Sequence, residues 1–170
     1  MTKPSPDSTS FYAAFAPVCF TLLGLWLIVV QTRHADWRRS PEHRRRAYAV
    51  SLHFAIPGLM SLLALVDPAD ATVWRVSFGV SAAAGALILG YLQFSPIPTP
   101  RGRLWQIEST VSIVFYVLVV LVAAAPGVAK EIGAPLRIEA ILLSLIVFLG
   151  INVAWALMFD EVPAVGHERG

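Results

Sequence analysis

The sequence predicts an all-α fold: a polytopic membrane protein in which residues 1–170 form a single bundle of five transmembrane helices. Composition is the first reason, since 56% of the residues are hydrophobic and only 14% are charged. With a mean hydropathy of +0.67, the chain has more apolar surface than a water-soluble fold of this size can bury. The second reason is spacing. The apolar residues gather in five stretches that approach the ~20 residues a helix needs to cross ~30 Å of hydrocarbon.

The five stretches cover most of the chain. None of them alternates strictly between apolar and polar residues, so the strands of a membrane barrel are not expected. The connections between them contain helix-breaking residues, among them SPE, DPAD and SPIPTPRG, and are too short to hold a separate soluble domain. The expected spans are 11–30, 47–66, 73–94, 107–125 and 138–159.

The first span, 11–30, is expected to be retained. Its positive charges follow the apolar run, whereas a cleavable signal peptide carries them in front and ends in a small-residue cleavage site. Cys19, the only cysteine of the chain, lies in this span, so neither an intrachain disulfide nor a multi-cysteine metal site can form. Pro17 is expected to kink the helix near its outer end.

The second and third spans have different characters. The second, 47–66, holds His53 and, one turn later, Pro57, which is expected to kink the helix. The third, 73–94, has small residues at every fourth position, such as Ser77, Ser81 and Gly85. Because small residues at this spacing let helix backbones approach closely, we expect the third span to lie either at the centre of the subunit or at an oligomer contact.

The fourth span, 107–125, has a polar stripe. Glu108, Ser112 and Tyr116 recur every four residues, so they share one face of a helix. Beyond them, VLVVLV at 117–122 surrounds the helix with bulky side chains that we expect to contact lipid. The fifth span, 138–159, contributes Asn152.

Six arginines fall in the connection 31–46, which is expected to be a cytoplasmic loop. Lys and Arg accumulate beside the cytoplasmic ends of membrane spans, and the third connection adds Arg101 and Arg103. With both connections inside, the N-terminus lies outside and the C-terminus, after five crossings, lies in the cytoplasm. We expect the arginines to lie beside anionic lipid headgroups, which attract each of them by ~1 kcal/mol. The residues given this role are Arg38, Arg39, Arg44, Arg45 and Arg46.

Two other roles fit the connection 31–46 less well. Nucleic-acid binding calls for a folded basic face or aromatic platforms, and a short stretch with one tryptophan offers neither. Metal binding through its histidines and acidic residues is opposed by the neighbouring guanidinium charges, and their spacing matches no established metal site. We therefore expect the bilayer itself as the partner, with no nucleic acid and no metal.

Polar side chains within the spans are the candidates for function, because burying them in a bilayer is costly. They concentrate in the cytoplasmic half of the expected bundle. His53 and Asn152 lie ~9 and ~10 Å from the cytoplasmic boundary by helical rise, so the two could meet. The alternative role for such groups is to hold the helices together by hydrogen bonds. The candidates are His53, Glu108, Ser112, Tyr116, Asn152, Gln31 and Gln93.

Sequence signs of catalysis are missing. HExxH, GxSxG, GxGxxG and P-loop patterns do not occur, and these are the patterns by which common catalytic sites are recognised. A membrane haem protein would need axial ligands beyond His53, and a thiol oxidoreductase would need a second cysteine. We expect neither an enzyme nor a bound cofactor.

Two functions remain. The favoured one is a channel for ions or protons, formed by a homo-oligomer because five short helices are too few to enclose a roomy pore. The alternative is a non-catalytic accessory or assembly subunit, which would pair with other membrane subunits. Arginine strongly outnumbers lysine among the 13 basic residues, a bias that suggests a bacterial gene and hence the bacterial inner membrane.

Overall fold

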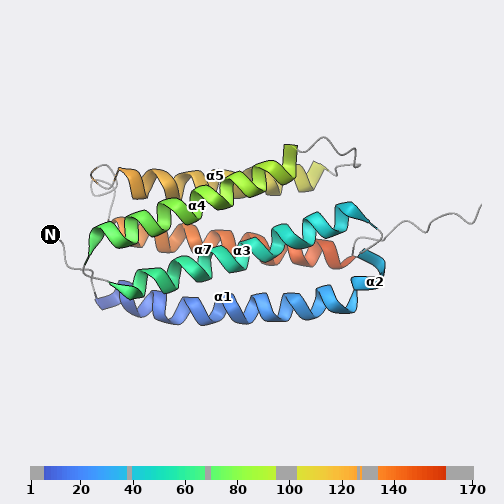
Figure 1. Ribbon diagram of the computed structural model, residues 1–170, viewed down its shortest axis with the longest axis horizontal. Coiled ribbons are helices and arrows are strands. Elements are labelled where there is room, and N and C mark those ends of the chain that lie inside the picture. Colours follow the sequence, from blue (N-terminus) through green and yellow to red (C-terminus); the bar gives the residue numbers. More distant parts are fainter. Residues whose placement is uncertain are drawn as a thin grey trace, which may run out of the picture.

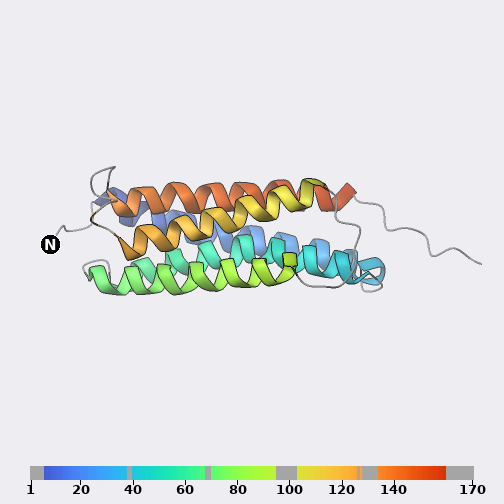
Figure 2. The same ribbon diagram turned by 90° about the horizontal axis from the view of Figure 1, so that it is seen from above.

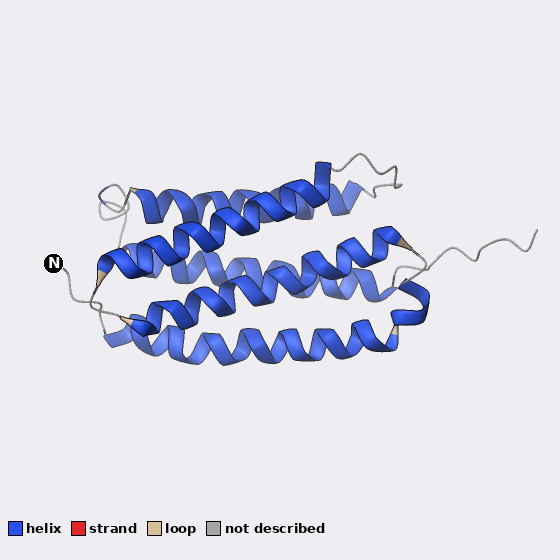
Figure 3. Cartoon of the chain, viewed as in Figure 1, coloured by secondary structure: helices blue, strands red, loops and turns tan. Residues whose placement is uncertain are grey.

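The structure, a computed structural model, describes residues 6–37, 40–67, 70–94, 103–125, 127 and 134–159. Every regular element in these ranges is a helix, joined by short loops where the connections are described (Figure 3). A single short helix, α2 (His34–Trp37), lies between the first two long ones. The five long helices are α1 (Pro6–Thr32), α3 (Pro41–Val66), α4 (Ala71–Phe94), α5 (Arg103–Ala124) and α7 (Pro135–Phe159).

The long helices lie side by side and run in alternating directions (Figures 1 and 2). The central helix is α3, which packs against α1, α4 and α7 and is the most buried of the five. The bundle is completed by α5, which packs against α4 and α7. The end of the bundle at which α1 finishes at Thr32 and α3 begins at Pro41 is called the arginine end below. The end at which α3 finishes at Val66 is called the opposite end.

All five long helices are long and apolar enough to cross a membrane. Each of them exposes large apolar side chains, including Leu25 of α1, Leu87 of α4 and Phe148 of α7. Lipid accommodates such surfaces, whereas water disfavours them when they are extensive. Five apolar helices of this kind are typical of a multi-pass membrane protein. The expected all-helical fold, with five helices long and apolar enough to span a membrane, is confirmed for the described residues.

All five long helices begin before the expected spans, most clearly α3, whereas α3, α4 and α7 end at the expected residues. The helix α3 begins at Pro41, not at Ala47. Ser40 is its N-cap, and the side chain of Ser40 accepts a hydrogen bond from the backbone N–H of His43. Proline is favoured at the first position of a helix, and an acidic residue in the first turn, here Glu42, is favoured by the helix dipole. The SPE sequence therefore starts a helix where we expected it to break one.

The expected loop 31–46 is consequently mostly helical. The first turns of α3 carry Arg44, Arg45 and Arg46. Arg46 forms an ion pair with Glu42 one turn earlier, a spacing at which a helix brings two side chains together. The remaining two arginines given a headgroup role, Arg38 and Arg39, lie outside the described residues.

The third expected span, α4, packs within the subunit through its small residues. A Cβ placed on Gly85 would lie 3.0 Å from the side chain of Ile56 in α3 and 3.1 Å from that of Tyr116 in α5. The glycine thus lets α4 approach two neighbours closely. The centre of the bundle, however, is occupied by α3 and not by α4.

Both expected kink positions lie inside continuous helices. The helical segment α1 runs through Pro17, and α3 runs through Pro57. Pro57 has no N–H, so the carbonyl oxygen of His53, one turn earlier, lacks its usual helical donor. The hydroxyl of Ser61 in turn donates to the carbonyl oxygen of Pro57 at 2.8 Å.

Candidate functional site

His53 lies halfway along α3 and is only 2% exposed. Its Nδ1 is 2.7 Å from the carbonyl oxygen of Ala49, one turn earlier in the same helix. Its Nε2 is 2.7 Å from the hydroxyl oxygen of Ser112, which belongs to α5. The imidazole therefore bridges the central helix and a neighbour, and both of its nitrogens have partners.

The partners of His53 constrain where its protons lie. A carbonyl oxygen only accepts, so Nδ1 carries a hydrogen and donates it to Ala49. The Ser112 hydroxyl has one proton and two possible acceptors. One is Nε2 of His53, and the other is the backbone carbonyl oxygen of Glu108, which lies 2.9 Å from the Ser112 hydroxyl oxygen. If Ser112 donates to Nε2, the imidazole is neutral. If Ser112 instead donates to the backbone carbonyl oxygen of Glu108, Nε2 must donate to the Ser112 oxygen. Both ring nitrogens then carry a hydrogen, and the imidazole is charged.

Rotation of one hydroxyl thus switches the Ser112 hydrogen bond between two states. The heavy-atom distances suit both states, which differ by one proton on Nε2 that must come from a group outside this pair of side chains. The hydrogen bonds around His53 therefore fit either protonation state of the imidazole.

Tyr116 continues the polar face of α5 one turn beyond Ser112. It is fully buried, and its hydroxyl donates to the carbonyl oxygen of Leu52 in α3 at 3.3 Å. The stripe expected on the fourth span therefore faces the interior. Three of the candidate residues, His53, Ser112 and Tyr116, lie together at the contact between α3 and α5.

Glu108 is placed differently from the other members of this stripe. It is only half-buried, one turn closer to the arginine end than Ser112. Its carboxylate interacts with the positive charge of Arg46. The Arg46 guanidinium also lies 5.3 Å from the ring centre of Trp105, so Glu108 belongs to a charged cluster at the arginine end.

Gln93 of α4 forms two hydrogen bonds with α5 near the arginine end. Its side-chain oxygen accepts from the hydroxyl of Ser109 at 2.8 Å, and its side-chain nitrogen donates to the hydroxyl of Thr110 at 3.1 Å. Both atoms of the amide are therefore used between helices, which is the arrangement expected of a packing contact.

Two candidates do not join the buried groups. Gln31 is exposed in the last turn of α1. Asn152 is exposed on α7, and its side-chain nitrogen donates to the carbonyl oxygen of Phe148 in its own helix at 2.7 Å. The expected meeting of Asn152 with His53 does not occur, because α7 turns Gly150 toward the histidine instead.

Glu139 is a buried acidic residue that is not among the candidates predicted from the sequence. It lies one turn inside α7 at the opposite end of the bundle and is fully buried. Neither carboxylate oxygen forms a hydrogen bond with the described residues. Tyr12 of α1 is close enough to interact electrostatically, but its hydroxyl donates to the carbonyl oxygen of Leu136 at 2.9 Å.

Two of the buried titratable groups, His53 and Glu139, lie at different depths. By helical rise, Glu139 is ~6 Å from the opposite end and His53 is ~20 Å from it. A buried polar group without a partner is rare and calls for an explanation. Within the described ranges, no group of three or more His, Cys, Asp or Glu residues is arranged to hold a metal ion.

No known protein-family model matches the chain, and no curated protein and no solved structure is significantly similar to it. The functional interpretation therefore depends on the buried groups themselves.

Proposed function

We propose that this protein lies in a membrane and conducts protons through the interior of its helix bundle. The observation that carries the proposal is the hydrogen bond of 2.7 Å between His53 Nε2 and Ser112 Oγ. It lies halfway along the central helix, and its geometry fits either protonation state of the imidazole. Histidine is the side chain whose unperturbed titration falls nearest to physiological pH, and ionisable groups inside membrane spans often form proton relays.

Glu139 supports the same function from the other half of the bundle. An unpartnered carboxyl group in an apolar interior is destabilising, so packing gives no reason for its presence. As a second proton-binding group, ~14 Å from His53 along the axis by helical rise, it would extend the route toward the opposite end. Water molecules are the natural bridge over such a distance, since they hydrogen-bond to several groups at once.

Close packing around His53 favours protons over larger ions. A Cβ added to Gly150 would lie 2.5 Å from the Cβ of His53, so α3 and α7 are in tight contact there. A metal cation or halide needs an open pore or a ring of coordinating groups, whereas a proton needs a chain of hydrogen bonds. The proposed route therefore runs within one chain, and the expected homo-oligomer stays a prediction with no part in the route.

The proposed orientation places the arginine end in the cytoplasm, with the N-terminus outside. Five described arginines lie at that end, namely Arg33, Arg44, Arg45, Arg46 and Arg103. Only two described arginines, Arg75 and Arg137, lie at the opposite end. Basic residues accumulate on the cytoplasmic side of membrane proteins, and the bacterial inner membrane is the proposed location.

Flux into proteoliposomes tests this function. The purified protein is reconstituted into liposomes that enclose a pH-sensitive dye, and a potassium diffusion potential set by valinomycin drives protons inward. We expect faster acidification than in protein-free liposomes, and no added permeability to K⁺ or chloride when valinomycin is left out. The proposal fails if no proton flux appears at any imposed pH difference or voltage.

One observation favours the alternative role of an accessory subunit. Asn152 is a polar side chain on the exposed face of α7, beside the paired rings of Trp155 and Phe159, whose centres are 5.2 Å apart. Exposed amides in membrane helices stabilise contacts with other helices. The accessory role predicts that the protein always copurifies with another membrane protein and that Asn152→Leu releases it. If both are observed and the liposomes show no proton flux, the accessory role replaces the proposed one.

A further inference from the structure

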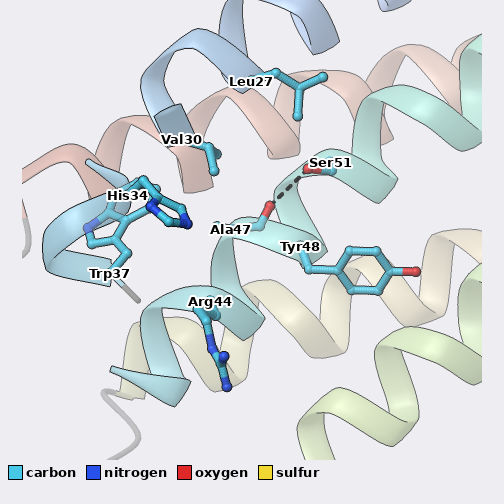
Figure 4. A pocket seen from close by; sticks show the side chains of 8 residues that line it. All are labelled: Leu27, Val30, His34, Trp37, Arg44, Ala47, Tyr48 and Ser51. Atoms are coloured by element: carbon cyan, nitrogen blue, oxygen red, sulfur yellow. Dashed lines mark hydrogen bonds between the residues drawn. The ribbon is translucent and has the colours of Figure 1, made fainter. Parts of the chain in front are cut away.

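A groove opens on the surface of the bundle at the arginine end, between α1, α2 and α3 (Figure 4). Its volume is about 290 Å³, at the lower limit of the ~300–1,000 Å³ typical of ligand pockets. Its wall is largely apolar and is formed chiefly by Leu27, Val30, Trp37, Ala47 and Ser51.

The deep part of the groove offers little for a polar ligand to bind. The hydroxyl of Ser51 already donates to the carbonyl oxygen of Ala47 at 3.1 Å (Figure 4). That same carbonyl oxygen accepts the indole N–H of Trp26 at 3.1 Å. These polar atoms are therefore occupied within the protein, and the groove presents hydrocarbon to whatever enters it.

The mouth of the groove has the opposite character. Arg44 and His34 line it, and both side chains are exposed. The nearby Glu42 is engaged by Arg46, and Arg44 forms no ion pair within the described part of the chain. By helical rise, Arg44 and Ser51 are ~10 Å apart along α3, so the groove changes from cationic to apolar over that distance.

We propose that this groove binds an anionic phospholipid of the surrounding membrane, with one acyl chain against the apolar wall and the phosphate at Arg44 and His34. Charge and shape complementarity both select this occupant. An acyl chain fits a groove that is lined with hydrocarbon and begins near the membrane surface. Basic pockets between helices at that level suit anionic headgroups. This site is distinct from a general attraction between arginines and the bilayer, because it depends on the groove as well as on charge.

Native mass spectrometry of the detergent-purified protein tests this site, with dioleoyl phosphatidylglycerol and dioleoyl phosphatidylcholine as probes. We expect the wild-type protein to retain one phosphatidylglycerol molecule per chain in preference to phosphatidylcholine. Arg44→Gln should lower that preference about fivefold, which is the effect of one basic side chain near anionic lipid. Arg137→Gln is the matched charge control, because Arg137 is exposed at the opposite end, and it should leave the preference unchanged.

Filling the groove separates a built site from surface attraction. Ser51→Phe and Val30→Phe should each abolish retention of both lipids. Ser144→Phe is the control: Ser144 is also half-buried, and its hydroxyl also donates to a carbonyl oxygen one turn earlier, that of Ala140. It should bind lipid as the wild type does, with circular dichroism used to select folded variants.

Three results would overturn the site. The first is equal retention of the two lipids by the wild-type protein. The second is retention that both folded groove-filling variants leave intact. The third is an equal loss with Arg44→Gln and Arg137→Gln, which would show that net charge alone attracts the lipid. None of these results bears on proton flux, so the lipid site and the proposed function are tested independently of each other.

Discussion

Gly150 of α7 and His53 of α3 are in such close contact that a Cβ on the glycine would lie 2.5 Å from the Cβ of the histidine. This contact holds the imidazole between α7 and α5. No side chain larger than hydrogen fits at position 150 unless α3 or α7 moves.

Gly150→Ala should therefore destabilise the protein. Overpacking a well-packed interior costs ~1–3 kcal/mol, and here the obstacle is the base of a side chain, which cannot swing away. Gly90→Ala is the control, since nothing lies within 4 Å of a Cβ at that position, and alanine is the better helix former by up to ~1 kcal/mol. Denaturation in detergent should show a loss of stability for the first variant only. Equal stability of the two variants would mean that the close contact is absent in the protein.

Ser112→Ala should destabilise the protein by ~1–3 kcal/mol, because it leaves the buried Nε2 of His53 without its partner. Ser144→Ala removes a hydroxyl that bonds only within its own helix and should have little effect. Unfolding in increasing denaturant measures both. If the two variants are equally stable, Ser112 does not hold the histidine.

Glu139→Leu should stabilise the folded protein while abolishing proton flux. The substitution removes a buried carboxyl group that has no hydrogen-bond partner among the described residues, and burial of such a group costs ~1–3 kcal/mol on the scale of protein mutations. A thermal unfolding midpoint above that of the wild type is expected. A lower midpoint would show that Glu139 has a stabilising partner and is a structural residue.

Reporter fusions after Val66, Ala125 and Gly170 should report outside, outside and inside. The expected pattern follows from the arginines at one end of the bundle and the rule that basic residues stay in the cytoplasm. A phosphatase that is active only outside the cytoplasm and a fluorescent protein that folds only inside it give complementary signals. The reversed pattern would invert the proposed orientation.

The helices could be predicted from the sequence because hydrophobicity and length alone distinguish a membrane span. The residues at which they begin could not. Polar residues such as Arg44 to Arg46 extend α3 beyond its apolar part, and only the start signal around Ser40 and Pro41 indicates this.

The candidate site could be predicted in part. The spacing of Ser112 and Tyr116 indicates a shared face, and that face is buried against α3. The direction in which Asn152 points could not be predicted, because α7 is apolar on all sides and its sequence does not show which side meets its neighbours. Glu139 lies so near the start of the fifth expected span that it resembles a residue at the membrane surface. Its burial arises from the packing of α7 against other helices.

The most direct test of the proposed proton route is a comparison of proton flux among wild-type, His53→Gln and Glu139→Gln proteins in the same liposomes. Glutamine roughly keeps the size of each side chain and some of its hydrogen bonds, but it does not titrate. Gln31→Ala is the control, since Gln31 is exposed at the end of α1. The account predicts that wild type and Gln31→Ala acidify the liposomes and that both glutamine variants fall to the level of protein-free liposomes. Flux that both folded glutamine variants retain at the wild-type rate would contradict it.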